Sequence, residues 1–476
     1  MNKLTQQLLL FIAAFCTVIP SHSQDPADGK APTAFADSLP QRWIYSSEFT
    51  QPFPTDDSWW SAFNDPLLDS LIAEGEAANF NLAAASRRIE MARQNLRTVR
   101  SSYYPQIAVN AGWNKERTSA VTMARGGQAT TIDYFNAGAT VSWEIDIFGR
   151  VAARARESKA HISASRADYA AVSVSICAEI ATAYVQLRML QEQLAVTKAH
   201  VAEQEKVMKI AEARFECSLA SMLDVRQART VYYSTKASLV ALHTSINTTV
   251  NSLAVLTGCY PQQLAPRLAS AAPLPQFSGN LGAGVPMDLL RRRPDVAEAE
   301  YTLAAYAAAI GIAKKEFLPT LSLNGSIATE AHRFDDLMTH RSLAYSVAPT
   351  LSWTVFDGFA RRAAVASAKE QMLAGIDNYN LTLLTAVQEV ENAMTSYTDA
   401  NAYLEEIKLV EENARKAFEL SLDRYKQGLD AFINVAQAQI SLLQYSNELV
   451  AARANSLTAV ITLYKALGGG WSSQQL

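Results

Sequence analysis

Two halves of this chain repeat each other in register, and this duplication constrains the fold more than any other feature. Trp143 and Trp353 lie in similar alternating stretches 210 residues apart, and Arg214 and Arg424 open two similar segments at the same separation. A period this long indicates a duplicated half-molecule and not a solenoid repeat. Each half is expected to contain a helix, two strands, a very long helix, a turn and a second long helix.

The limits of the two halves follow from the prolines and from composition. Pro105 and Pro319 are 214 residues apart, so the first half is four residues longer between its proline and its tryptophan. We expect a first repeat over 59–258, a linker rich in Pro and Gly over 259–286, and a second repeat over 287–471.

The N-terminus has the pattern of an exported protein. The apolar run 8–18 is shorter than the ~20 residues that a membrane helix needs, and small residues follow it. We therefore predict a signal peptide over 1–23 and an extended arm over 24–58. The alternative is lipidation at Cys16, although Phe15 stands where a lipoprotein signal has a small residue. No later apolar run is long enough to predict a helical membrane anchor.

Four segments alternate between apolar and polar residues, which is typical of strands. In residues 139–147 the odd positions are apolar and the even positions are polar, and residues 342–355 copy this pattern. Residues 106–113 and 321–327 alternate in the same way. The expected content is two strands in each half.

Each pair of strands is followed by an exceptionally long helical segment. Residues 150–216 contain no Gly or Pro, and residues 359–427 contain only Gly375. At 1.5 Å per residue, such helices are about 100 Å long. Short turns at Ser218 and Gly428 lead into second long helices. In the last of these, apolar residues fill two adjacent heptad registers, which indicates packing against neighbours on two sides.

Four strands cannot close a barrel by themselves. Open strand edges in lipid leave backbone groups unpaired at a cost of several kcal/mol each, so strands in a membrane would have to be pooled by several chains. A soluble sheet with one buried face shows the same alternation. The signal peptide, the length of the helices and the duplication favour the membrane barrel.

The chain resembles the TolC-like outer-membrane efflux factor family, and within it the multidrug (RND-type) efflux branch. The resemblance covers residues 59–471 and includes both hairpin turns. Its most specific segments are 59–72, 289–303, 310–325 and 463–471.

The resemblance implies an α+β membrane protein that forms a homotrimer. Its duplicated half-repeats would pool four strands per chain into a twelve-stranded outer-membrane β-barrel, continued by a long periplasmic α-helical barrel. It further implies contact with outer-membrane lipid, a periplasmic adaptor (membrane fusion protein) and an inner-membrane RND-type transporter. The implied function is an exit duct for drugs and other small compounds. Two alternatives are the channel of a type I protein-secretion system and a secreted coiled-coil adhesin without a pore.

The family also implies roles for residues near the two turns. Asp224 and Tyr425 match positions of a lock that holds the helical tunnel shut, whereas Asp430 stands where an arginine sometimes completes that lock. The narrowest ring would carry Asn434 and Gln437 in place of aspartates. A neutral amide ring implies weak charge selectivity.

Further positions are implied at the same end of the tunnel. The aperture ring would be flanked by Ile433 and Ile440. The tips that dock on the adaptor would comprise Arg214, Ser218, Leu219, Arg424, Gly428 and Leu429.

Nothing in the sequence predicts an enzyme. Glu144 and Asp146 resemble a glycosidase pair, but a water-filled lumen explains them equally and is preferred. Arg291, Arg292 and Arg293 precede a helix start at Pro294 and are expected to be solvated. No metal or cofactor motif is present, and the absence of a basic block gives no reason to expect a nucleic-acid partner.

Overall fold

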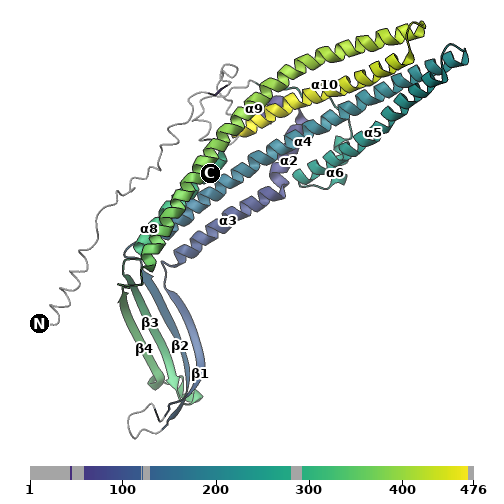
Figure 1. Ribbon diagram of the computed structural model, residues 1–476. Helices are drawn as coiled ribbons and strands as arrows, with labels where there is room; N and C mark the ends of the chain where they lie inside the picture. Colours follow the sequence, from purple (N-terminus) through teal and green to yellow (C-terminus); the bar gives the residue numbers. More distant parts are fainter. Residues whose placement is uncertain (1–42, 45–57, 120, 122–128, 280–291, 470–476) are drawn as a thin grey trace. The chain divides into compact units, whose positions relative to one another are not determined.

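The computed structural model describes residues 43–44, 58–119, 121, 129–279 and 292–469. The predicted signal peptide and Cys16 lie outside these residues, as does most of the predicted arm. Within the arm, Trp43 is buried in a cluster with Met394 and Leu463 of the two long helices in the second half. Figure 1 shows the order of the elements along the chain.

The elements of the two halves have matching lengths. α4 (Arg150–Glu216) and α9 (Ala360–Lys426) each contain 67 residues, and α5 (Met222–Leu256) and α10 (Phe432–Ala466) each contain 35. The members of each pair start 210 residues apart. This equality of length confirms the duplication.

The elements before the long helices repeat in the same way. α3 (Phe80–Ser101) and α8 (Pro294–Lys315) each contain 22 residues. β1 (Gln106–Arg117) and β3 (Thr320–Ala331) each contain 12. The remaining larger elements are α2 (Pro66–Ala78), α6 (Pro261–Leu268), β2 (Thr131–Ile145) and β4 (Leu343–Ser352).

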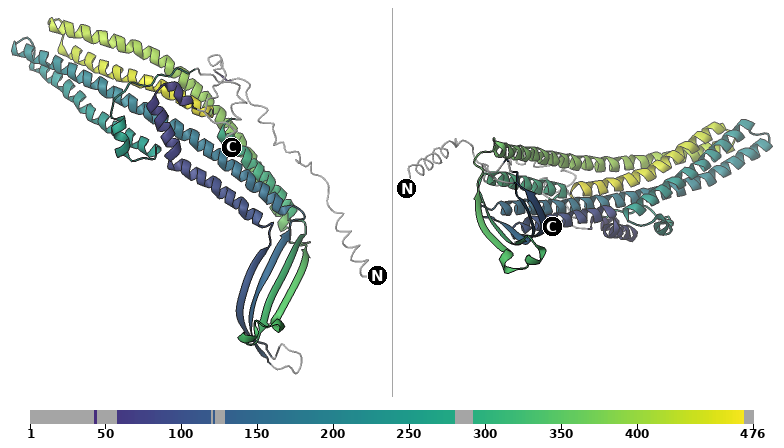
Figure 2. Two further views of the ribbon diagram at one scale, coloured as in Figure 1. Left: turned by 180° about the vertical axis from the view of Figure 1, so that it is seen from behind. Right: turned by 90° about the horizontal axis from the view of Figure 1, so that it is seen from below.

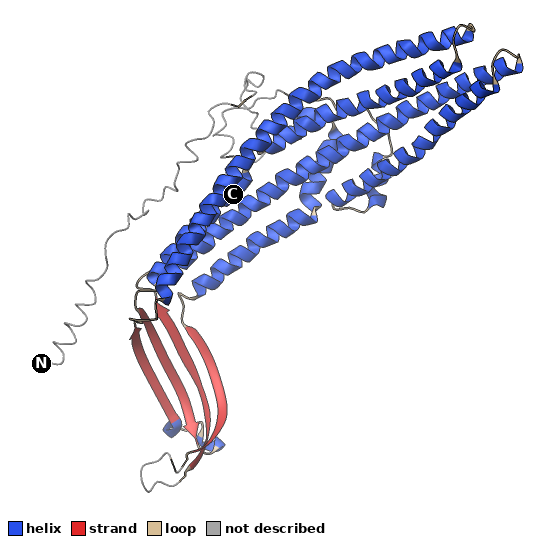
Figure 3. Ribbon diagram, in the orientation of Figure 1, coloured by secondary structure: helices blue, strands red, loops and turns tan. Residues whose placement is uncertain are grey.

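The four strands form one antiparallel sheet in the order β1-β2-β3-β4 (Figure 1 and Figure 3), so within the described residues β1 and β4 each leave one edge without a partner. Gly138 lies opposite Asn110 on one side and Ala328 on the other. None of the strand residues is buried, and apolar residues such as Val109 and Tyr345 are each 80% exposed. A soluble sheet would bury one face, so the structure excludes that alternative for this sheet.

The long helices lie side by side as two hairpins (Figure 2), which we call the first hairpin (α4 and α5) and the second hairpin (α9 and α10). The two hairpins meet where α10 packs on α4. α8 lies against both α4 and α9. The close approach of α8 to α9 explains why position 375 of α9 is a glycine. A Cβ atom there would lie 2.7 Å from the ring of Tyr306 in α8.

Contrary to the sequence prediction, two helices contain an 18-residue stretch apolar enough to cross a membrane by length and composition, namely α4 and α5. In α4 more than half of that stretch is buried within the chain. Packing between helices therefore accounts for its apolar composition. In α5 only 17% is buried, so most of that stretch has no cover in a single chain.

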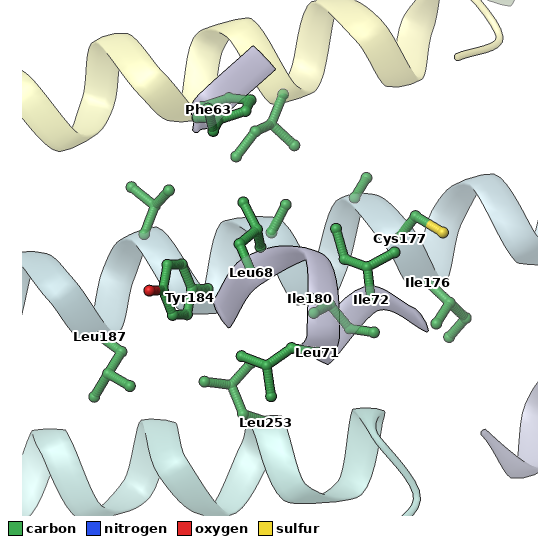
Figure 4. Packing of buried hydrophobic residues seen from close by; sticks show 14 of the residues in the cluster. Phe63, Leu68, Leu71, Ile72, Ile176, Cys177, Ile180, Tyr184, Leu187 and Leu253 are labelled. Atoms are coloured by element: carbon green, nitrogen blue, oxygen red, sulfur yellow. The ribbon is translucent and has the colours of Figure 1, made fainter. Parts of the chain in front are cut away.

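The largest core cluster joins α2, α4, α5, α6 and α10 around Tyr184 (Figure 4). Leu68 and Leu71 of α2 are fully buried there, and burial of each such side chain stabilises the fold by about 1.5–3 kcal/mol. The hydroxyl of Tyr184 donates to Asp65 Oδ2 at 2.6 Å and accepts from Arg188 Nε at 3.0 Å. Asp65 also caps α2, so this network ties the start of the first repeat to α4.

The expectation that the arginines before α8 are solvated is wrong for Arg293, which is 7% exposed. Its guanidinium lies 2.8 Å from Asp295 and 2.6 Å from Glu389 of α9, and it donates to the carbonyl oxygen of Ala466 at 2.7 Å. The side chain therefore fastens the end of α10 to α8 and α9. Two carboxylates and one helix-terminal carbonyl compensate for burying the charge.

Glu144 and Asp146, interpreted from the sequence as lumen carboxylates, have a structural role within the chain. Glu144 pairs with Arg150 at 2.5 Å, and Arg150 contacts Glu316 at 3.1 Å. Asp146 accepts from the backbone N–H groups of Val151 and Ala152. Both carboxylates are thus engaged in joining strand β2 to helix α4.

The two tryptophans of the repeat make matching contacts at the strand–helix junctions. Trp143 Nε1 donates to the carbonyl oxygen of Tyr103 at 3.0 Å, and Trp353 Nε1 donates to that of Phe317 at 3.0 Å. Trp143 lies within β2 and Trp353 directly follows β4, so each indole joins the end of the second strand of its repeat to the turn after α3 or α8. This conserved geometry explains why both halves keep a tryptophan at this position.

Candidate functional site at the hairpin tips

The two hairpin turns have the same backbone conformation. Ser218 (φ 61°) and Gly428 (φ 78°) both occupy the left-handed region. The N–H of Leu219 donates to the carbonyl oxygen of Arg214 at 2.7 Å, and that of Leu429 donates to Arg424 at 2.9 Å. These bonds are typical of a helix that ends with a left-handed residue.

The helices after the turns begin differently. Ser221 caps α5: its hydroxyl accepts from the backbone N–H of Asp224 at 3.2 Å and donates to the Asp224 carboxylate at 2.8 Å. The equivalent residue at the start of α10 is Ala431, whose side chain cannot cap. Asp430 instead accepts from the N–H of Ala431 at 2.9 Å.

Tyr425, predicted to belong to the lock, is 2% exposed. Its ring lies 5.3 Å from that of Phe432, and both belong to a core cluster that includes Val207 and Ala211 of α4. Among the described residues none makes a hydrogen bond of good geometry to its hydroxyl, although Arg214 and Asp224 both lie near it. Burial raises the pKa of Tyr425, and the nearby negative charge of Asp224 adds to the shift. The packing of Tyr425 and Phe432 against α4 thus holds the second hairpin on the first.

Arg214 makes the polar contact between the two tips. Its Nη1 donates to the carbonyl oxygen of Lys426, at the end of α9, at 2.7 Å. Its guanidinium carbon lies 5.0 Å from the centre of the Tyr425 ring, within range of a cation–π interaction. A cation at the C-terminus of a helix also interacts favourably with the helix dipole.

This role of Arg214 was not predicted, because the sequence placed it only among the docking residues of the tip. Arg214 and Arg424 match in the repeat, and each guanidinium lies near the carbonyl of the leucine five positions later. Only the folded structure shows that one of them crosses to the other hairpin. The wide separation in sequence left no signal for that contact.

Asp430 does not join this cluster. Its carboxylate lies 3.5 Å from Arg424 Nε and accepts from Asn434 Nδ2 at 2.6 Å. The hydrogen bond from Asn434 is the main reason that the pKa of Asp430 is lowered. Asp430 therefore organises its own turn, while Asp224, Tyr425 and Arg214 come together between the hairpins.

The four predicted aperture residues share one exposed face of α10, opposite its buried residues. Ile433 is 43% exposed and Ile440 is 54% exposed. Asn434 and Gln437 are exposed between them. The amide of Asn434 already donates to Asp430, so Gln437 is the freer of the two amides. No other described residue of a single chain covers these four side chains fully.

The tip leucines Leu219 and Leu429 are 66% and 62% exposed. Within the described ranges, no group of three or more His, Cys, Asp or Glu side chains is placed to hold a metal ion.

The match to a family model decides how this architecture is classified. The model described as "Outer membrane efflux protein" matches residues 71–259 and 285–469.

The chain belongs to the outer membrane efflux protein family.

Individual relatives agree over nearly the whole length. This efflux protein is 29% identical to the pyoverdine export outer membrane protein OpmQ of Pseudomonas aeruginosa, over 94% of this chain and 95% of OpmQ. It is 28% identical to the solvent efflux pump outer membrane protein SrpC of Pseudomonas putida, over 98% of each chain. The solved structure of the outer-membrane channel OprN matches with a TM-score of 0.82 and 27% identity, covering 91% of this chain and 97% of OprN.

These findings confirm the resemblance seen in the sequence. The efflux protein has the fold of the trimeric TolC-like channels, in which duplicated half-repeats supply four strands per chain to a barrel continued by long helices. It is an outer-membrane efflux channel that extends into the periplasm.

Proposed function

We propose that this channel is the exit duct of a tripartite efflux pump and that it passively conducts drugs and other small compounds across the periplasm and outer membrane. The observation that carries the proposal is the sheet, whose residues are all at least partly exposed and whose two outer edges have no partner strand in the part of the chain that the structure describes. The relatives OpmQ and SrpC are named for pyoverdine export and solvent efflux. Both names favour small compounds over the alternative of type I protein secretion.

The channel is a homotrimer in this proposal. The free edges of β1 and β4 would leave their outward backbone groups without partners in lipid, at several kcal/mol each. Pairing β4 of one chain with β1 of the next removes both edges. Three chains of four strands then close a twelve-stranded barrel, whose exposed apolar residues, such as Val109 and Val347, meet lipid.

The partners are a periplasmic adaptor and an inner-membrane RND-type transporter. The tips that would dock on the adaptor consist of Arg214, Ser218, Leu219, Arg424, Gly428 and Leu429. The exposed leucines supply apolar area on an otherwise polar turn, as expected of a contact surface. No catalytic step is assigned to the chain.

The tips also form the gate. Asp224 and Tyr425, together with Arg214, hold the second hairpin on the first, and Asp430 fixes the turn of the second hairpin. Three copies of Ile433, Asn434, Gln437 and Ile440 then surround the threefold axis and form the aperture.

Planar-bilayer recording and cross-linking of the purified protein test the duct. Defined single-channel conductance and a three-chain cross-linked species in mild detergent are expected. A stable folded monomer whose strand amides are all protected from exchange would contradict the trimer, because the edges of an isolated sheet cannot be protected. Efflux of a small dye from cells that carry the matching adaptor and transporter tests the function.

Charge selectivity tests the aperture. A neutral ring lacks the fixed charge that concentrates cations, so weak selectivity is expected in a salt gradient. Gln437→Asp would place three carboxylates near one axis, and their repulsion would raise their pKa values while favouring cation entry. Gln437→Ala is the neutral control. Strong cation selectivity in the unmodified channel would show that other carboxylates control the pore.

A further inference from the structure

Phe359 adopts a backbone conformation that is rare for an aromatic residue. It precedes α9 at φ 70° and ψ 11°, in the left-handed region, and its side chain is 65% exposed. Its counterpart Gly149 precedes α4 at φ 69° and ψ 34°. Glycine takes this conformation without strain, whereas a bulky residue does so at a cost in free energy. The ring of Phe359 contacts that of Phe356, which is itself 73% exposed, so burial within one chain compensates little for the strain.

In the first repeat, the position of Gly149 has no room for a side chain. Lys315, the last residue of α8, donates from Nζ to the carbonyl oxygen of Gly149 at 2.7 Å. A Cβ atom built on Gly149 would lie 3.0 Å from that Nζ. Because Phe359 has nearly the same φ and ψ, its side chain points to where the counterpart of Lys315 would end.

The duplication identifies the counterpart of Lys315. The second strand and the long helix recur after 210 residues, whereas the preceding helix and the first strand recur after 214. The strand register agrees with both values, since Gln106 pairs with Ser142 in the first repeat and Thr320 pairs with Ser352 in the second. Lys315 therefore corresponds to Ser101, the last residue of α3.

The arrangement of the helices places this serine in a neighbouring subunit. Packing within the chain gives the order α3, α4, α8, α9, so that α3 and α9 lie at the two sides of the helical layer (Figure 1). When β4 of one chain pairs with β1 of the next, α9 lies beside α3 of that next subunit. The boundary between α4 and α8 within the chain is thus the template for the boundary between subunits.

The two boundaries differ in charge and in side-chain size. Within the chain, Arg150 and Arg154 of α4 form ion pairs with Glu316 at 3.1 and 3.2 Å, in addition to the hydrogen bond from Lys315. The counterparts of these four charged residues are small and exposed in a single chain, namely Ala360, Ala364, Ser102 and Ser101. The boundary between subunits therefore lacks these ion pairs and has space where long side chains lie within the chain.

We propose that Phe359 is a contact residue between subunits at the joint of barrel and helical tunnel, and that its ring fills the space beside Ser101 and Ser102 of the next subunit. This inference rests on the homotrimer of the proposed function and names residues that hold its boundary. Burial of the ring compensates for the strained backbone. The joint is then apolar between subunits, whereas it is ionic within each chain.

Cysteine cross-linking tests where the side chain at position 359 lies. In the full chain, with the three native cysteines of the described residues replaced by serine, Phe359→Cys with Ser101→Cys should form disulfide-linked dimers and trimers on mild oxidation. Phe359→Cys with Arg87→Cys is the distance control, because Arg87 is exposed on α3 about 20 Å from Ser101. The control pair should form no linked species. A trimer in which the first pair does not link would overturn the proposal.

Exchange of the two kinds of contact tests their equivalence. Phe359→Gly removes the ring, and the trimer should dissociate at least about tenfold faster in mild detergent because a buried aromatic side chain is lost. Ser101→Lys alone should also speed dissociation, since the lysine would meet the ring. The double variant recreates the pairing of a lysine with a glycine carbonyl oxygen found within the chain, so it should restore most of the lifetime of the trimer. Loss of lifetime that simply adds in the double variant would contradict the proposed contact.

Membrane lipid is the other occupant that an exposed aromatic residue at this joint could meet. In that case Phe359→Gly would weaken insertion into phospholipid vesicles, leave the lifetime of the trimer unchanged and make Ser101→Lys harmless, and the proposal would be overturned. Phe148→Ala is the matched control, because it removes a partly exposed aromatic side chain at the joint of the first repeat. It should not shorten the lifetime of the trimer, and a loss equal to that of Phe359→Gly would contradict a specific contact.

The state of the unmodified protein separates the two levels of the argument. A monomeric unmodified protein would contradict the proposed homotrimer and the contact of Phe359 with it. A stable trimer without a link between positions 359 and 101 would contradict the contact alone, so the two failures are distinguishable.

Discussion

The two hairpin tips have the same length and turn geometry but differ in what their aromatic and apolar residues contact. Tyr425 and Phe432 of the second tip are buried against α4, at 2% and 1% exposure. Their counterparts in the first tip, Phe215 and Met222, are 38% and 46% exposed. The duplication therefore reproduces the scaffold of the hairpin, whereas side-chain differences decide which tip is docked.

The two tips also differ in how the helix after the turn is capped. The first tip is stabilised within itself by Ser221 and Asp224. The second tip has Ala431 and Asn434 at these positions and is held from outside by Arg214. A hairpin that depends on contacts with its neighbour can be released by breaking those contacts. In the proposed gate, this difference makes the second hairpin the moving part.

The largest effect is expected from Phe432→Ala. Removal of a buried aromatic side chain typically costs about 3–5 kcal/mol, and here the loss would fall on the docking of the second tip. Hydrogen exchange of the α10 amides should accelerate strongly. Met222→Ala is the matched control in the first tip and should have little effect. Equal acceleration by both variants would show that the two tips are not differently docked.

Arg214→Ala should have the next largest effect. It removes a charged hydrogen bond worth about 1.5–3 kcal/mol and a cation–π contact worth about 0.5–1 kcal/mol. Single-channel conductance or open probability should increase. Arg424→Ala removes the equivalent arginine, which contacts only its own turn in the described structure. If Arg424→Ala opened the channel as much, the contact between the tips would not be the lock.

The lock residues predicted from the sequence should contribute less, and unequally. Tyr425→Phe keeps the aromatic packing and removes a hydroxyl that makes no hydrogen bond of good geometry to the described residues, so it should change the stability by no more than about 0.5 kcal/mol. Asp224→Ala removes a carboxylate in the first turn of α5, worth about 0.3–1 kcal/mol. The double variant should raise conductance about as much as Asp224→Ala alone. A much larger effect of the double variant would reveal a coupling that the geometry does not show.

The architecture could be predicted from the sequence because helices and strands leave regular patterns in it. The absence of Gly and Pro from 150–216 predicted α4 to its last residue, and strict alternation located all four strands. Sequence alone left a soluble sheet open as an alternative. Only the exposure of every strand excluded it.

The contacts of individual charged residues were much less predictable. Arg293 was expected in water, yet it is buried in an ion pair and also bonds a carbonyl more than 170 positions away. The ion pair between Glu144 and Arg150 was not predicted either. Arg214 reaches across 212 positions. Such pairings depend on how distant helices align, and no local pattern encodes that alignment.

The last comparison concerns the turns themselves, where an exchange of the left-handed residues is expected to have an effect as modest as that of the lock variants. Ser218 adopts φ 61°, a conformation that is unfavourable for a residue with a Cβ, whereas Gly428 adopts φ 78° without that strain. Ser218→Gly should stabilise the first tip by no more than about 1 kcal/mol, because the relief of strain is partly offset by the greater freedom of glycine in the unfolded chain. Gly428→Ser should destabilise the second tip by about 1 kcal/mol, and it should also raise the open probability because that tip is the docked one. Thermal unfolding and bilayer recording on the two variants separate these effects. An equal change in gating from both substitutions would mean that the tips contribute equally to the gate, against the asymmetry seen in their packing.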